Sequence, residues 1–335
     1  MPSDDITPAT RLTRRAFLQI SGGCAAHLML MASVDPRLAR HLFASPAQAA
    51  TTAVEPWGRL ELLSDGVWAM VSTPLDGDRT TLCNGGIIAG ADGAMVIESF
   101  ASEEGAAWMA TQTRELTGRA PTHVVLTHYH GDHSNGLAGF VAEDERPEFF
   151  ATEVTRDLVR RADEARADPP RADRTAALTN LTLLPTDRPL VIDLGGRRVR
   201  VVPRLGHTAS DVTVELEDPS IVWCGDLVWN AMFPNYRDAL PSQLAASVRA
   251  LRRDRSTVYV AGHGGNASAA DLTRYLEVLD HVGSAARAAF EQGIPADEAA
   301  AQYRLPAALG TWFMFSPRYY SVAFQAWERE LRARG

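Results

Sequence analysis

Residues 127–133 read Thr-His-Tyr-His-Gly-Asp-His, and they directly follow His-Val-Val-Leu at 123–126, which predicts a buried strand. On an extended segment, side chains two residues apart point the same way, so His128 and His130 are expected to approach one ion together. Asp132 and His133 stand at the turn beyond and are expected to face a second ion. Imidazole and carboxylate groups suit zinc and related divalent ions. The density of these groups favours a metal site over a chance set of surface histidines.

Three further ligand candidates each follow a predicted strand and lie beside glycine, which permits a tight turn or a close backbone approach. His207 lies in Gly-His-Thr after a strand ending at residue 202. Asp226 follows the strand 221–224, and His263 follows the strand 258–261. A single histidine is more often structural, so each position is weak alone. The shared layout indicates that all three belong to the same site as the first cluster.

The order of predicted elements is similar in the two halves of the chain. The first half has β-runs at 66–71, 86–89 and 94–98, and then a helix that begins at the N-cap Ser102 and stops at Gly118. In the second half, strands 190–194 and 198–202 flank a Gly-Gly hairpin signal, and strands at 212–216, 221–224 and 258–260 follow, with a helix near 242–252. From about residue 269 the pattern is mostly helical. Two packed sheets with helices outside satisfy this order.

The ordered set of HxHxDH, GHT, GD and GHG resembles the metallo-β-lactamase-fold hydrolases over most of residues 60–282. The resemblance implies an α+β fold, the αββα sandwich, with the site on loops at one edge of the sheets. It implies two metal ions, zinc being the main candidate: the first held by His128, His130 and His207, the second by Asp132, His133 and His263, and both by Asp226. It also implies that a hydroxide bridging the metals attacks the substrate, with Asp132 as the catalytic residue that orients it.

The ligand set gives partial information on the substrate, which is expected to be a small ester, lactone, thioester or amide. Zinc β-lactamases tend to carry Cys or Ser where Asp226 stands, so the chain is more similar to the glyoxalase II-like and lactonase-like branches. A class B-type β-lactamase, a mononuclear iron persulfide dioxygenase-like oxidoreductase and a non-catalytic metal-binding protein remain alternatives. Trp229, Phe233 and Tyr236 are predicted to line the entrance, or else to pack the loop. The aromatic-rich stretch 312–327 predicts core packing or a hydrophobic lid.

The N-terminus is predicted to be an export signal. Residues 13–19 contain the pair Arg14-Arg15 and have the form of a twin-arginine motif, and an A-x-A-like processing site follows at 47–49. The intervening apolar stretch is shorter than the roughly 20 residues a bilayer needs, so no stable membrane span is expected. We therefore expect a signal peptide at 1–49, a catalytic domain at 50–283 and a helical C-terminal extension at 284–335 packed on it. The export machinery is an expected partner, and the location is periplasmic or secreted. A cytosolic tail and a lipid anchor on Cys24 are the alternatives.

Composition excludes several other classes of protein. The net charge is −8 without a basic block, which argues against a nucleic-acid partner. The chain has no lysine, so a lysine nucleophile or Schiff base is impossible. Three scattered cysteines do not form a disulfide framework, and Cys83 and Cys224 are expected to be buried free thiols. The oligomeric state stays open.

Overall fold

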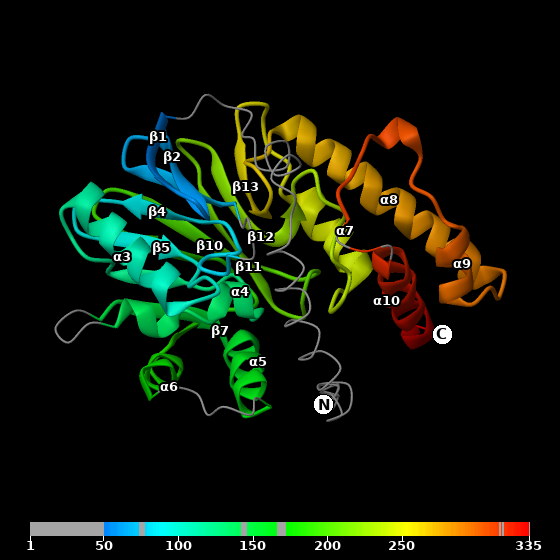
Figure 1. Ribbon diagram of the computed structural model, residues 1–335, viewed down its shortest axis with the longest axis horizontal. Coiled ribbons are helices and arrows are strands. Elements are labelled where there is room, and N and C mark those ends of the chain that lie inside the picture. Colours follow the sequence, from blue (N-terminus) through cyan, green and yellow to red (C-terminus); the bar gives the residue numbers. More distant parts are fainter. Residues whose placement is uncertain are drawn as a thin grey trace, which may run out of the picture.

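Two β-sheets with helices on their outer faces make up the protein (Figure 1). The computed structural model describes residues 50–73, 78–141, 146–165, 172–314, 316 and 318–334. The predicted signal peptide lies outside the described residues. Within them, no helix combines the length and the apolar character needed to cross a membrane.

The first sheet has eight strands in sequential order. They are β1 (Ala50–Glu55), β2 (Gly58–Ser64), β3 (Val67–Ser72), β4 (Gly85–Ala89), β5 (Ala94–Ile97), β6 (His123–Val125), β7 (Glu148–Thr152) and β8 (Thr182–Leu184). Pairing is antiparallel from β1 to β5 and parallel from β5 to β8. Parallel neighbours direct the carboxyl ends of β5 and β6 to the same sheet edge, where the histidine-rich cluster begins.

The second sheet has five strands. Their spatial order is β13 (Val258–His263), β12 (Ile221–Trp229), β11 (Asp211–Leu216), β10 (Arg198–Arg204) and β9 (Leu190–Asp193). Only the β12–β13 pair is parallel. The predicted hairpin between β9 and β10 is confirmed, and its Gly195 and Gly196 adopt φ values of 88° and 75°, which favour glycine.

Helices cover both outer faces of the sandwich. On the first sheet lie α3 (Glu103–Thr117), η1 (Leu137–Phe140), α5 (Glu153–Glu164) and α6 (Ala172–Thr179), whereas the short α4 (Gly131–Ser134) lies in the segment between β6 and η1. On the side of the second sheet lie α7 (Pro241–Ala250), α8 (Ala269–Glu291), α9 (Ala296–Gln302), η2 (Ala307–Leu309) and α10 (Arg318–Arg334). The ends predicted for α3 are confirmed, because Ser102 Oγ accepts from the Gly105 amide and Gly118 is left-handed. The predicted αββα sandwich is therefore confirmed.

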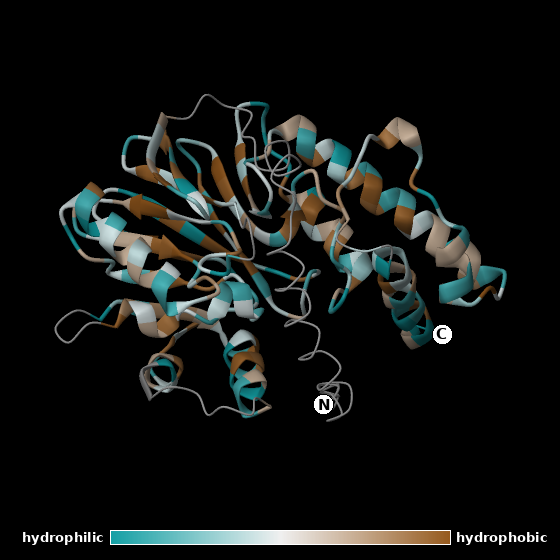
Figure 2. Ribbon diagram, in the orientation of Figure 1, coloured by the Kyte–Doolittle hydropathy of each residue, from teal (hydrophilic) through white to brown (hydrophobic). Residues whose placement is uncertain are grey.

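Burial on both faces of the first sheet creates two hydrophobic clusters, and apolar residues line the strands of both sheets (Figure 2). In β3, Val67, Ala69 and Val71 belong to the cluster shared with the second sheet, whereas Trp68 and Met70 belong to the cluster under α3. This alternation is the period of two that a strand imposes.

The C-terminal helices continue the same core. Buried residues of α8, α9 and α10 join the cluster that contains the second sheet. The domain boundary expected between residues 283 and 284 falls inside the continuous helix α8. Cys83 and Cys224 are buried free thiols, as predicted.

Candidate metal centre

Seven buried side chains converge where the two sheets meet. They are the predicted ligands His128, His130, Asp132, His133, His207, Asp226 and His263. The first four follow β6 of the first sheet, and the last three belong to the second sheet and its loops. In each of the groups that could hold an ion, the ligand atoms lie within 4.8 Å of one another.

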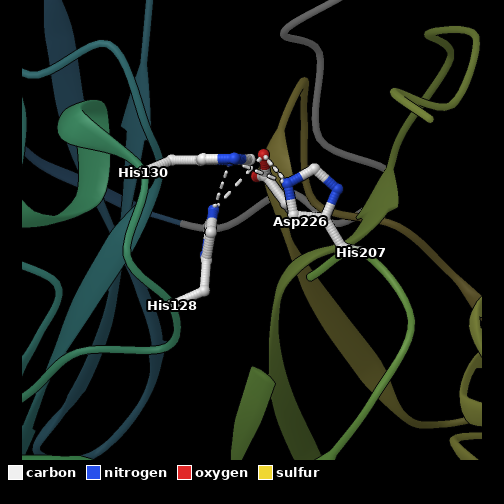
Figure 3. A group of neighbouring side chains, drawn as sticks. All are labelled: His128, His130, His207 and Asp226. Atoms are coloured by element: carbon white, nitrogen blue, oxygen red, sulfur yellow. Dashed lines mark hydrogen bonds and ion pairs between the residues drawn. The ribbon is translucent and has the colours of Figure 1, made fainter. Parts of the chain in front are cut away.

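The first group consists of three imidazoles and one carboxylate, all pointing toward one another (Figure 3). His130 Nδ1 lies 3.1 Å from His128 Nε2 and 2.9 Å from His207 Nε2. Asp226 Oδ2 lies 3.3 Å from His207 Nε2 and 3.8 Å from His128 Nε2. Three ring nitrogens and one oxygen around a common point match the tetrahedral N/O set that zinc takes.

The second group faces the other oxygen of the same carboxylate. Asp226 Oδ1 lies 3.2 Å from His133 Nε2 and 3.2 Å from His263 Nε2. Asp132 Oδ2 lies 3.2 Å from His263 Nε2 and 3.6 Å from His133 Nε2. Asp226 therefore stands between the two groups with one oxygen toward each.

The strands that carry Asp226 and His263 are longer than predicted. We expected both residues in turns after strands ending at 224 and 261, but β12 continues to residue 229 and β13 to residue 263. The parallel pairing persists because its register shifts on both sides of Gly225, which has a φ of 51°. A Cβ at Gly262 would lie 2.1 Å from Asp226 Oδ1, so that position requires glycine for space.

Glu98 orients two of the histidines, a role that sequence reasoning missed. Its Oε1 accepts a 2.5 Å hydrogen bond from Thr127 Oγ1 and lies 3.0 Å from His133 Nδ1. Thr127 Oγ1 also lies 3.0 Å from His128 Nδ1. The Nδ1 atoms of both rings face this pair, and their Nε2 atoms face Asp226 in the site.

Asp238 orients His130 in the same manner and was also missed. Its Oδ2 accepts from His130 Nε2 at 2.8 Å and from the Tyr129 hydroxyl at 2.7 Å. A donor at Nε2 leaves Nδ1 as the lone pair that faces His128 and His207. Neither Glu98 nor Asp238 belongs to a sequence motif. A signal existed for Glu98, because a charged residue at the end of the predicted strand 94–98 is a candidate for the site.

The backbone that carries His207 is fixed by a buried carboxylate. Asp211 Oδ2 accepts from the amides of His207 and Thr208, and Asp211 Oδ1 accepts from the Thr208 hydroxyl at 2.7 Å. Burial raises the pKa of Asp211 to about 7 despite these donors. The contacts explain the local role of the Gly-His-Thr sequence, because its threonine closes the turn that presents the histidine.

Burial and the facing carboxylates shift the pKa values of the histidines in opposite directions. Burial lowers the pKa of His207 to about 3 and that of His128 well below its usual value, so both rings are neutral. At His263 burial also lowers the pKa, but the charges of Asp226 and Asp132 outweigh it and raise the pKa to about 9. Burial alone would raise the pKa of Asp226, but the facing histidines, His263 first, hold it well below its usual value.

These groups fit divalent metal ions. Buried charges in proteins are paired or coordinate metals. Among the described residues, Asp132 Oδ2, His133 Nε2 and Asp226 Oδ1 are buried atoms without a hydrogen bond, and all three border the second group. The donors are nitrogen and oxygen, which suits zinc and its neighbours.

The three aromatic residues predicted for the substrate pocket lie behind the site. Trp229, Phe233 and Tyr236 are 0%, 1% and 1% exposed and belong to the hydrophobic cluster of the second sheet. The Trp229 ring packs on His263, with centroids 4.5 Å apart. Their position supports the ligands, and contact with a substrate stays a prediction.

Two curated relatives match parts of the chain. A curated hydroxyacylglutathione hydrolase of Acidiphilium cryptum is 31% identical over 181 residues, which are 54% of this chain and 65% of that relative. Another hydroxyacylglutathione hydrolase, of Glaesserella parasuis, is 27% identical over 110 residues, 33% of this chain and 37% of that relative. The chain thus spans less than two thirds of the length of these relatives.

Solved structures show the same fold. The sec-alkylsulfatase Pisa1 from Pseudomonas sp. superposes with a TM-score of 0.63 at 15% identity, over 81% of this chain and 49% of its own. A metallo-beta-lactamase from Erythrobacter litoralis superposes with a TM-score of 0.53 at 16% identity, over 69% of this chain and 100% of its own. A family model matches residues 79–263, more than half of the chain and all seven converging ligand candidates, and on this ground the chain belongs to the metallo-beta-lactamase superfamily.

Proposed function

We propose that the protein is a hydrolase that cleaves a small carbonyl substrate and depends on two divalent metal ions. Zinc is the first candidate for these ions. The observation that carries the proposal is the position of Asp226, whose two oxygens face two separate groups of ligand atoms. His128, His130 and His207 would hold one ion, Asp132, His133 and His263 would hold the other, and Asp226 would offer one oxygen to each.

The chain's own residues position the reactants. When bound, such ions would lower the pKa of water toward about 7 and polarise the carbonyl group. Asp132 would orient the attacking water, accept its proton and deliver that proton to the leaving group, which would make it the catalytic acid–base. Glu98, through Thr127, and Asp238 keep the histidine rings in the tautomers that a metal needs.

The substrate that we propose is an acyl compound with a good leaving group, and thioesters are the first candidates. Support comes from two relatives whose names state hydroxyacylglutathione hydrolysis. Further support comes from a carboxylate at Asp226 and from the absence of any lysine that could bind a β-lactam carboxylate. Lactones and simple esters share the same carbonyl chemistry and belong to the same proposal.

The test is a metal analysis combined with a hydrolysis screen of the full chain. Purified protein is reloaded with zinc, its metal content is measured, and it is assayed on thioesters, lactones, esters and β-lactams. We expect about two ions per chain, because seven ligands exceed the four that one zinc takes, and turnover of at least one thioester, lactone or ester. One tightly held iron, with no second ion after reloading, would overturn the proposal in favour of an oxidative enzyme.

We also propose that the protein is exported by the twin-arginine machinery to the periplasm or beyond. The support is the Arg14-Arg15 pair followed by the processing site at 47–49. This route carries folded proteins, which would suit a chain whose metal-ligand candidates come together only when its two sheets have packed.

A further inference from the structure

The segment that carries His263 is held by hydrogen bonds to its backbone carbonyls. This His263 segment comprises residues 261–266, the end of β13 and the chain that leads toward α8. Each of its six consecutive carbonyls accepts a hydrogen bond from one of two asparagines, Asn84 and Asn230. Buried backbone carbonyls need such partners wherever regular pairing ends. The position of a metal-ligand candidate therefore depends on two residues outside its own strand.

Asn84 reaches the His263 segment from the first sheet. It directly precedes β4 and is 3% exposed. Its Nδ2 donates to Ala261 O at 2.8 Å and to Gly264 O at 2.7 Å, and its backbone amide donates to Gly262 O at 2.8 Å. Its Oδ1 accepts from the Ser72 amide at 2.8 Å. Both donors and the acceptor of the side chain therefore have partners, and only an amide in this orientation satisfies all of them.

Asn230 holds the same segment from the second sheet. It directly follows β12, the strand that carries Asp226. Its backbone amide donates to His263 O at 3.0 Å. Its Nδ2 donates to Gly265 O at 3.1 Å and to Asn266 O at 3.3 Å. The His263 segment is thus fixed from both sheets at once.

We propose that Asn84 and Asn230 are positioning residues that set the affinity of the second ligand group for its ion and do not affect the first group. His263 Nε2 lies 3.2 Å from Asp226 Oδ1 and 3.2 Å from Asp132 Oδ2, so displacement of the His263 backbone would open the second group. The first group contains no residue of the His263 segment. The inference rests on the proposed function with two ions. Removal of a residue that orients a ligand typically weakens metal binding by about 10–100-fold.

The test is a cobalt(II) titration of the full chain after removal of its metal, because cobalt absorbs visible light and zinc does not. His263→Ala removes a ligand of the second group and so identifies the absorption band of that group. Asn84→Ala should weaken binding at this band about tenfold, while the band of the first group appears at the wild-type cobalt concentration. Asn230→Ala, at a half-buried position, should act in the same direction and decides the test if Asn84→Ala does not fold.

Trp223→Phe is the matched control. The Trp223 indole donates to Gly85 O at 2.9 Å, so this variant also loses a buried hydrogen bond between the sheets, at the residue next to Asn84. It should lower the melting temperature and leave both cobalt affinities unchanged. Wild-type affinity in Asn84→Ala and Asn230→Ala would overturn the proposal, and so would an equal loss in Trp223→Phe or at the first group.

A failure of the proposed function gives a different result. A wild type that takes one ion, or that hydrolyses none of the substrates in the screen, counts against that function. The variants are then compared for the ion that the wild type holds, and a loss in Asn84→Ala without a loss in Trp223→Phe still supports the role of the asparagines. Cobalt binding that His263→Ala leaves unchanged would overturn that role.

Discussion

Replacing Asp238 by Asn tests whether an orienting carboxylate sets the metal affinity. Asp238 Oδ2 accepts from His130 Nε2 at 2.8 Å and from Tyr129 at 2.7 Å, and its side chain is only 8% exposed. Asparagine keeps the shape and removes the charge. The hydrogen bond to His130 then becomes neutral, and the ring is no longer held firmly in the tautomer that directs Nδ1 into the site.

The magnitude follows from the difference between two kinds of hydrogen bond. A bond to a charged group contributes about 1.5–3 kcal/mol and a neutral bond about 1 kcal/mol, which leaves a loss of roughly 0.5–2 kcal/mol. A loss of this size corresponds to a factor of about 2–30 in an equilibrium constant. In other metal sites, removing the hydrogen-bond partner of a ligating histidine weakens metal binding by about 10–100-fold, which overlaps this range.

The assay is competition for zinc between the protein and a chromophoric chelator. We expect Asp238→Asn to bind one of its ions about tenfold more weakly, with kcat/KM at limiting zinc falling in parallel. Asp280→Asn is the matched control, because the same chemical change occurs in an exposed ion pair with Arg249. If Asp238→Asn and Asp280→Asn kept the wild-type zinc affinity alike, the reasoning about Asp238 would be refuted.

Three further predictions concern the bridging residue, acid stability and export. Asp226→Asn should release at least one ion and lower kcat more than it raises KM, as elemental analysis and kinetics will check; two ions with full turnover would remove Asp226 from the ligand set. Burial alone would raise the pKa of Glu215, but hydrogen bonds from Thr213 and Arg204 lower it below its usual 4.5, so its stabilisation is present above that pH and is lost as the pH falls through the folded-state value. Urea unfolding from pH 7 to pH 3 should therefore show a shallower loss of stability for Glu215→Gln, and an unchanged slope would contradict the assignment. Replacing Arg14 and Arg15 by Lys should retain the protein in the cytoplasm, as fractionation will measure, and normal export of that variant would exclude the twin-arginine route.

Local sequence signals predicted the regular elements well. The helix α3 was delimited by an N-cap serine and a left-handed glycine, and the β9–β10 hairpin by Gly195-Gly196. Each of these signals acts within a few residues. The ends of β12 and β13 were predicted too early, because their pairing continues through register shifts that depend on the neighbouring strand.

The site was predictable to the extent that it lies in motifs. The spacing of the histidines and of Asp132 is local, and the structure brings all seven ligand candidates together. The orienting residues are separated from their partners by 29 positions for Glu98 and Thr127 and by 108 for Asp238 and His130. Such contacts arise only when the two sheets have formed and packed, so no local motif indicates them.

The division of the ligands between the sheets links ion binding to folding. His128 and its neighbours follow β6, whereas His207, Asp226 and His263 are contributed by the other half of the sandwich. An ion that binds both halves only when they are packed stabilises the folded state by about 4 kcal/mol at a thousand times its Kd. Stabilities of whole domains are about 5–15 kcal/mol, so this share is large. The melting temperature should then rise with the free ion concentration, and the ion supply where the chain folds would govern how much folded protein persists.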